Sequence, residues 1–236
     1  MVGSMALQPS DKAEADTNMA IQPQELETST REHLLDVAET LFLVQGVDHV
    51  SLRAIAREAG QKNPSALQYH FSNREGLIDA IVGRRLQQQE ARRALLLEDA
   101  LAAGGPIALR EVCSVMSGAA FLLCREDPSF RNVLGILGLQ QLTLASDYFT
   151  VEFSQEAPSL LALWQLGRQA LDHLPPEILA LRMEHAYGAG LLAMSRRANS
   201  KESFRGRRAE LFFNNLVDQV TAMLQAPISK ETKATM

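Results

Sequence analysis

Two very short helical segments on either side of a tight turn restrict the fold of this chain more than any other feature. Ser51 is a typical N-cap for the first segment, and Gly60 is a typical residue to end it. Asn63 followed by Pro64 predicts the start of the second segment, because proline is favoured in the first turn of a helix. A turn this tight sets the second segment across the first, so the second segment is expected to protrude.

Longer helices are predicted on both sides of this pair. A capping box of Ser29 and Glu32 opens a supporting helix that ends at Gly46. A second capping box, Ser72 with Glu75, opens a long helix with an aliphatic stripe on its buried side. The arginines of this long helix are expected on its solvated face: Arg84, Arg85, Arg92 and Arg93.

The rest of the sequence is also helical by pattern, and proline and glycine mark the breaks. We expect helices over residues 106–125, 128–145, 157–173, 176–198 and 204–225. The predicted fold class is all-α, with an N-terminal three-helix helix-turn-helix module and a larger C-terminal helical domain. The predicted division is a disordered arm (1–27), the helix-turn-helix module (28–75), the larger helical domain (76–226) and a flexible tail (227–236).

The composition disfavours several classes of protein. No apolar run approaches the roughly 18 residues of a transmembrane helix, and the N-terminal residues lack the apolar stretch of a secretory signal. The two cysteines, Cys113 and Cys124, make no disulfide framework, and no Cys/His cluster has zinc spacing. We therefore expect a cytoplasmic protein with no membrane association, no metal and no cofactor.

The net charge of −5 argues at first against nucleic acid, but the charge is unevenly distributed. Residues 51–74 hold one acid, Glu58, and four basic residues: Arg53, Arg57, Lys62 and Arg74. Because a phosphate group responds to the local field, this segment is favourable for nucleic acid although the whole chain is not.

The second short segment has the size and the side chains of a helix that reads the major groove of DNA. Its predicted outward residues carry groups that read base edges or bind phosphates: Gln61, Lys62, Asn63, Pro64, Ser65, Gln68 and Tyr69. Ser51, Arg53, His70 and Arg74 stand near helix N-termini on either side, where they are placed to hold the DNA backbone. Phe71 is assigned to the core, Tyr69 fits the core and the outer face equally well, and His70 alone would be an ordinary solvated residue.

The segment TREHLLDVAETLFLVQGVDHVSLRAIAREAG, followed by LQYHFSNREGLIDAI, resembles the DNA-binding domain of the TetR family of bacterial transcriptional repressors. The family has an aromatic-His-Phe element, then a Ser/Asn pair, a basic residue and Glu, which residues 69–75 match: Tyr69, His70, Phe71, Ser72, Asn73, Arg74 and Glu75. The turn over 61–65 is one residue longer than the common pattern, and Gln68 replaces a frequent tyrosine. The resemblance covers residues 29–90 and implies a double-stranded DNA operator and a homodimer as partners.

The C-terminal helices offer weaker signals. Methionine and aromatic residues at helical spacing are usually core, and that is the first interpretation of this region. The resemblance implies an effector pocket among these helices, which would be mostly apolar and would fit a small hydrophobic or aromatic molecule. Its candidate residues are Cys113, Met116, Ala120, Leu123, Trp164 and Arg168, with Arg168 available to an acidic group.

The last two long helices are predicted to form a dimer interface. Small residues between Ala186 and Ala193 would let another helix approach closely, and helix 204–225 is apolar on more than one side. The simplest arrangement buries one side in the protomer and the other in a four-helix interface, as in the TetR family. The predicted interface residues are Leu181, His185, Ala189, Leu192, Phe212, Leu216 and Val220.

The sequence favours a ligand-responsive transcriptional repressor that binds a palindromic operator as a dimer and is released by a small hydrophobic effector. The alternative is an all-α protein-interaction module without DNA binding. An enzyme is disfavoured, because the five histidines are scattered among unrelated helices and no HExxH, Gly-rich phosphate loop or GxSxG motif is present.

Overall fold

The computed structural model describes residues 23–63, 65–145, 157–200 and 202–236, and within these ranges it is helical with no strand. The all-α fold class is therefore confirmed, whereas most of the predicted N-terminal arm (1–22) lies outside the described residues. The helices are α1 Pro23–Gln45, η1 Val47–His49, α2 Leu52–Glu58, α3 Ser65–Phe71, α4 Arg74–Ala102, α5 Leu109–Glu126, α6 Pro128–Ala145, α8 Pro158–Ala170, α9 Pro176–Asn199, α10 Arg207–Gln225 and α11 Lys230–Ala234.

The first helices form a small unit, called the head here, which consists of α1, η1, α2, α3 and residues 74–86 of α4. Its apolar side chains come from each of these elements and are buried together, among them Leu34, Phe42, Ile55, Leu67 and Ile81. The short helices α2 and α3 hold their positions because their apolar faces contribute to this shared core, which neither helix forms alone.

The short helices begin and end as the sequence predicts. The Ser51 hydroxyl accepts a hydrogen bond from the Ala54 amide at 3.2 Å, and the Asn63 side chain accepts one from the Ser65 amide at 3.0 Å. Gly60 ends α2 with a φ of 67°, a left-handed conformation that glycine adopts without strain. Pro64, between these caps, lies outside the described residues.

Two helix starts differ from the prediction. Helix α1 begins at Pro23 rather than at the Ser29 capping box, since a proline followed by glutamates also suits a first helical turn. The N-cap of α4 is Asn73, whose side chain accepts a hydrogen bond from the Gly76 amide at 2.8 Å. Ser72 cannot serve as this cap because it has a φ of 62° in the turn that ends α3.

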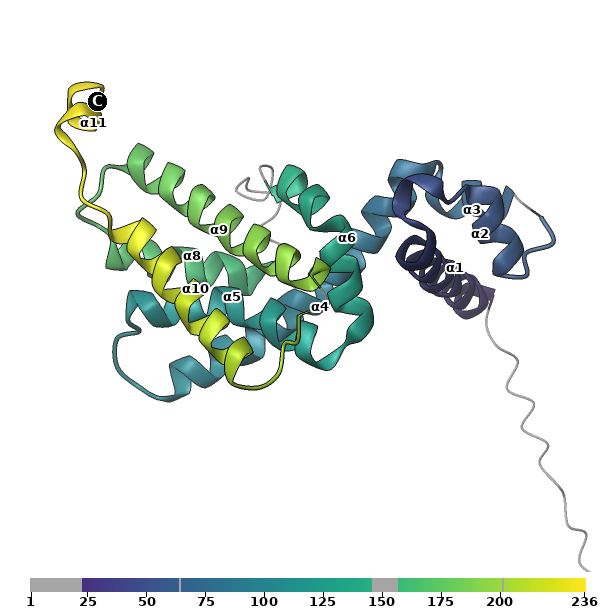
Figure 1. The fold of residues 1–236 in the computed structure, drawn as a ribbon, viewed down its shortest axis with the longest axis horizontal. Helices are drawn as coiled ribbons and strands as arrows, with labels where there is room; N and C mark the ends of the chain where they lie inside the picture. The colour runs from purple at the N-terminus through teal and green to yellow at the C-terminus, as the bar shows by residue number, and fades with distance from the viewer. Residues whose placement is uncertain (1–22, 64, 146–156, 201) are drawn as a thin grey trace, which may run out of the picture.

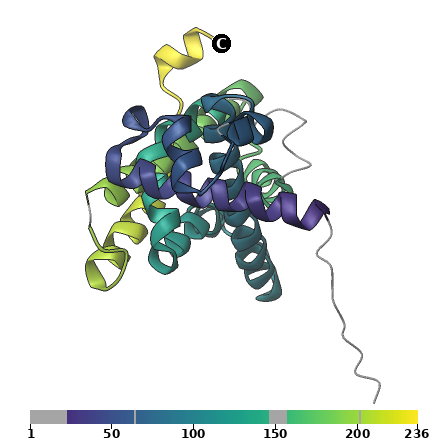
Figure 2. The same cartoon turned by 90° about the vertical axis from the view of Figure 1, so that its right-hand side faces the viewer.

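The larger unit, called the body here, consists of residues 87–102 of α4 with α5, α6, α8, α9 and α10. Figure 1 shows the head at one end of the molecule, joined to the body by the long helix α4, and α11 projecting at the opposite end. Figure 2 looks from the head's end and shows α1, α2 and α3 in front of the body. Val133 of α6 is buried in the head's core, so α6 also joins the two units.

The arginines of α4 do not lie on a solvated face, which corrects the prediction from sequence. Arg85 and Arg93 are 6% and 3% exposed, and each is paired with an acid. The polar pattern of α4 misleads because an arginine buried in an ion pair and an arginine in solvent cannot be told apart in the sequence. Burial is tolerated here because the charges are neutralised: Arg85 pairs with Glu39 of α1 and with Asp127, and Arg93 pairs with Glu90 on α4 itself.

The arginine pairs join α4 to α1. Arg85 donates to both carboxylate oxygens of Glu39 and, at 3.0 Å, to Asp127 at the start of α6. Arg84 donates to Glu39 at 2.6 Å and also contacts Glu32 and Asp36. Burial lowers the pKa of the Arg84 guanidinium, but these hydrogen bonds outweigh burial and raise the pKa, so the group stays charged. We call this cluster the α1–α4 clamp.

Candidate functional site

Helix α3 presents a polar face to solvent and an apolar face to the head. Leu67 and Phe71 are 1% and 5% exposed, as predicted, and they anchor the helix in the core. Ser65 and Gln68 are exposed, and Tyr69 is 75% exposed, so Tyr69 belongs to the outer face rather than to the core. The result is a short helix whose hydroxyl and amide groups point away from the protein.

Cations and helix N-termini lie beside this face. Ser51, Arg53, Lys62 and Asn63 are exposed in the structure, whereas Gln61 is half-buried. His70 is also half-buried, with its ring against Tyr69 at 5.1 Å between centroids. Two of the exposed members, Arg53 and Lys62, are cations.

Arg74 has a different environment from the one expected of a phosphate ligand. Its two terminal nitrogens donate to the backbone carbonyls of Val47 and Val50, and its guanidinium lies 5.7 Å from the centroid of the Phe42 ring. Arg74 therefore ties the start of α4 to the residues that precede α2. It positions the Ser51 N-cap rather than standing free for DNA.

Gly76 fixes the angle between α3 and α4. A Cβ atom at this position would lie 2.2 Å from the Phe71 carbonyl oxygen, a distance that real Cβ contacts do not reach. Only glycine lets α4 pass this close to the end of α3. The exposed face of α3 consequently has a fixed orientation relative to the long helix.

The head has known relatives. Residues 34–81, which run from α1 into α4, match the family model for bacterial regulatory proteins of the tetR family. The head is therefore a TetR-family DNA-binding domain of the helix-turn-helix type, and the matched residues include α2, α3 and the turn between them.

Solved structures resemble the whole chain. A protein from Shewanella sp. PV-4, assigned to the tetR family of transcription regulators, has a TM-score of 0.52 at 19% identity, over 81% of this chain and 95% of that one. A Mesorhizobium loti protein with the same assignment gives 0.46 at 16%, over 83% and 96%. RolR in complex with resorcinol gives 0.42 at 16%, over 88% and 98%. The first supports a TetR-like fold beyond the head, and no curated protein matches the sequence.

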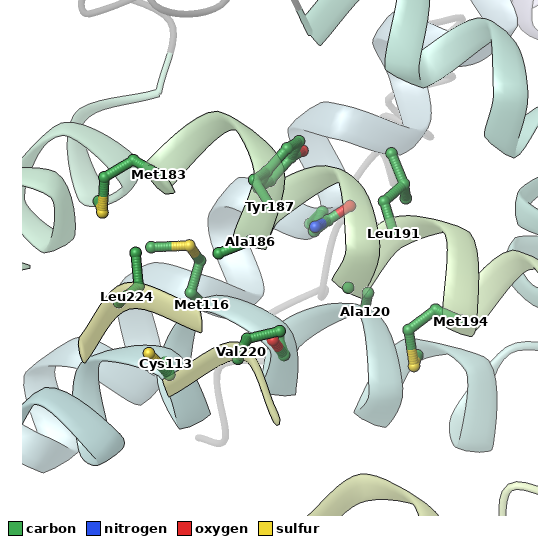
Figure 3. Close-up of a pocket in the computed structure, with 13 residues that line it drawn as sticks. Cys113, Met116, Ala120, Met183, Ala186, Tyr187, Leu191, Met194, Val220 and Leu224 are labelled. Atoms are coloured by element: carbon green, nitrogen blue, oxygen red, sulfur yellow. The ribbon is translucent and has the colours of Figure 1, made fainter. Parts of the chain in front are cut away.

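The body contains a cavity between α4, α5, α9 and α10, called the central cavity here (Figure 3). Its volume is about 40 Å³. Figure 3 shows side chains from α5, α9 and α10 gathered around it. The lining residues are Gln89, Cys113, Met116, Ser117, Ala120, Met183, Ala186, Tyr187, Gly190, Leu191, Met194, Val220 and Leu224.

The predicted effector residues are divided between two places. Cys113, Met116 and Ala120 line the central cavity. Trp164 and Arg168 instead line an open hollow of about 650 Å³ between the end of α8 and the start of α9, and Leu123 packs against the body's core. The structure therefore brings the predicted α5 residues together at the central cavity and places the predicted α8 residues at a separate hollow.

Several lining residues were missed by the sequence reasoning. Gln89 lies on α4 and is only 4% exposed, and nothing in the helical pattern distinguishes it from the exposed glutamines beside it. Tyr187 and Gly190 lie on α9 among small residues that were assigned to close helix contact. Gly190 does face other helices, but it faces α5 and α10 of its own protomer.

The titratable groups of the central cavity are neutral at physiological pH. Burial raises the pKa of the Cys113 thiol, and a hydrogen bond with Thr221 and the charge of Arg110 only partly oppose it. Burial also raises the pKa of the Tyr187 phenol, against the opposing effect of Arg93. The thiol and the phenol therefore both keep their protons.

The predicted dimer residues have three kinds of environment. On α9, Leu181 and Leu192 are 46% and 41% exposed, and His185 is exposed as well. On α10, Leu216 and Val220 are each 4% exposed and pack inside the protomer. Of the remaining two, Ala189 and Phe212 are half-buried.

The outward face of α10 is formed by other residues. Leu211 is 69% exposed and Met223 is 37% exposed, with the exposed Asn215 between them. Helices α9 and α10 lie side by side in the body (Figure 1). No helix of the described residues is long and apolar enough to cross a membrane.

Proposed function

We propose that this TetR-family regulator is a homodimeric repressor that binds a palindromic operator and leaves it when a small hydrophobic molecule binds. The observation that carries the proposal is the polar, exposed face of α3 on a helix held rigidly by Leu67 and Phe71. Such a helix fits the major groove, and its side chains meet base edges there. The protein acts by binding alone, without a catalytic step, in the cytoplasm where bacterial DNA lies.

The head's residues take two roles on DNA. Ser65, Gln68 and Tyr69 on α3 read base edges, and the turn residues Gln61, Asn63 and Pro64 place the start of α3 in the groove. Arg53 and Lys62 neutralise phosphates, with Ser51 and His70 beside them. The exposure of Arg53 and Lys62 supports this assignment, whereas the carbonyl contacts of Arg74 support a positioning role for that residue.

The dimer is proposed to form through the exposed faces of α9 and α10. Large apolar side chains that stay exposed on adjacent helices mark a surface that another protein covers. Leu181, Leu192 and Leu211 have this property in the protomer. A two-fold arrangement of these faces would place two α3 helices on two half-sites of one operator.

The effector is proposed to bind in the central cavity. The cavity touches α4, which is the helix that carries the head, and this contact gives a bound molecule a physical route to DNA affinity. An effector that weakens DNA binding tenfold must itself bind the DNA-bound form tenfold more weakly, a coupling of about 1.4 kcal/mol.

The proposal is tested by measuring the affinity of the protein for the promoter beside its own gene at several salt concentrations. Arg53→Ala and Lys62→Ala should each lower the slope of log K against log salt by about 1 per contact in each subunit. Gln68→Ala should instead change the preferred base at one position, at a cost of roughly 1–3 kcal/mol.

Lys230→Ala removes a cation from α11, at the opposite end from the head, and serves as the matched control. Its salt slope should equal that of the unmodified protein. Equal slopes for all three cation variants would contradict the phosphate assignment. Binding that does not depend on DNA sequence at all would contradict the proposal that the protein recognises a specific operator.

A further inference from the structure

The lining of the central cavity is apolar and uncharged. Its members include three methionines and several alanine, leucine and valine side chains, and its polar side chains are Gln89, Ser117 and Tyr187. The nearest charges on α4 belong to Arg93 and Glu90, which neutralise each other in an ion pair of 2.5 Å and do not line the cavity. An ionised ligand would therefore lose its water without gaining a counter-charge.

Gln89 is the lining side chain whose amide is available to a ligand. The side chain is 4% exposed and lines the cavity, and within the described ranges no hydrogen-bond partner reaches its amide. A ligand in the cavity therefore gains a hydrogen bond with this amide without displacing a protein partner. The amide both donates and accepts, so it suits a hydroxyl, carbonyl or ether oxygen as well as an N–H group.

The size of the cavity requires movement of its walls. A volume of about 40 Å³ is far below the roughly 300 Å³ of a typical small-molecule pocket. Met116, Met183 and Met194 surround this space, and methionine is the side chain that rearranges most easily. A ligand thus enters by displacing methionines and not by filling a rigid hole.

We propose that the central cavity binds an uncharged, mostly apolar small molecule that carries one hydrogen-bonding group, and that this group is held by the Gln89 amide. This inference rests on the proposed function, because it specifies the effector of that same site. Gln89 lies one turn after Arg85, one of the two α4 arginines of the α1–α4 clamp. A ligand bonded to Gln89 therefore acts directly on the helix that carries the head.

Four probes of one shape test the ligand chemistry: benzyl alcohol, toluene, benzoate and benzylammonium. Their binding to the full-length protein is measured by calorimetric titration in the absence of DNA. Benzyl alcohol should bind most tightly, toluene up to about tenfold more weakly because it lacks the hydroxyl, and the two ions without saturation. Ions that bind as tightly as benzyl alcohol, or benzyl alcohol that does not bind, would overturn the proposal.

Gln89→Met tests the assigned residue, because it keeps the length of the side chain and removes the amide. The ratio of toluene to benzyl alcohol dissociation constants should fall to about 1, while toluene still binds. Gln87→Met, the same change at an exposed position of α4, should keep the ratio of the unmodified protein. An unchanged ratio in Gln89→Met overturns the role of Gln89.

Gly190→Met tests whether the ligand binds in the central cavity. Its added side chain would point toward Ser117 and Val220, whose nearest atoms lie 3.8 Å and 4.0 Å from an added Cβ, and would fill the cavity. Both neutral probes should lose affinity at least tenfold, and undiminished binding would overturn the location. If the unmodified protein failed to bind the promoter DNA in the salt-dependent affinity measurement, only the proposed function would be refuted, because these titrations contain no DNA.

Discussion

The packing of α3 against α4 leaves no room for a side chain at Gly76. A methyl group there would overlap the Phe71 carbonyl oxygen, with a Cβ to oxygen distance of 2.2 Å. Gly76→Ala should therefore destabilise the protein by about 1–3 kcal/mol and misorient α3, with a loss of operator affinity. Urea unfolding and DNA titration of the same sample measure the two effects.

Gly83 provides the control on the same helix. An added Cβ at Gly83 meets nothing within 4 Å, so Gly83→Ala should stabilise the helix by up to about 1 kcal/mol. If both variants changed stability by the same amount and in the same direction, the contact with Phe71 would not be the reason for Gly76.

Residue roles that depend on local chemistry could be predicted from the sequence, and those that depend on distant partners could not. The caps of Ser51 and Asn63 bond to amides within three residues, so their letters and spacing are sufficient evidence. Arg74 donates hydrogen bonds to carbonyls more than twenty positions away in the sequence. Its positive charge alone had suggested that it binds a DNA phosphate. The amide of Gln89 faces a cavity that exists only once four helices have packed.

The α1–α4 clamp is the element-scale contact that holds α1 against α4. Glu39 is 8% exposed and neutralises two arginines of α4. Glu39→Gln leaves a buried positive charge with too few partners, and we expect a loss of about 3 kcal/mol in the free energy of unfolding. Urea denaturation followed by circular dichroism measures this loss.

Asp36→Asn is the matched control, because Asp36 pairs with Arg84 from the same helix but its side chain is 68% exposed. Its effect should stay below about 1 kcal/mol. The double variant Glu39→Leu/Arg85→Met removes both buried charges and should recover part of the lost stability. A single variant at Glu39 that costs no more than Asp36→Asn would show that the clamp is not stabilising.

Most helix bounds were predictable to within a few residues, except the start of α1 and the short helix α11. Helix faces were predictable for α3 but not for α4 or α10. In α3, the large apolar residues Leu67 and Phe71 lie on one side of the helix, and this side is the one that packs into the head's core. In α10, apolar residues cover more than one side, and the sequence does not tell which side meets the protomer. The structure buries Leu216 and Val220 and exposes Leu211.

At the scale of the whole molecule, α4 belongs both to the head that is proposed to bind DNA and to the cavity that is proposed to bind the effector. Its first residues lie in the head's core, Arg85 joins α1, and Gln89 lines the central cavity. A change at the cavity needs no long chain of contacts, because one rigid helix connects it to the head. The two proposed activities are therefore coupled by the movement of one helix.

The last prediction concerns assembly. Leu181→Asp combined with Leu211→Asp should give a monomer, because it places charges on the exposed apolar faces of α9 and α10 without entering the protomer's core. The variant should keep the helical content of the unmodified protein and its affinity for a single half-site. It should lose the added affinity for the full palindrome, since one α3 helix reaches one half-site only. Sedimentation velocity gives the mass, and fluorescence anisotropy with half-site and full-site DNA gives both affinities.

Leu101→Asp, a change at a residue of α4 that is 55% exposed, is the control and should remain dimeric. A double variant that sediments as a dimer with full operator affinity would place the interface elsewhere on the body.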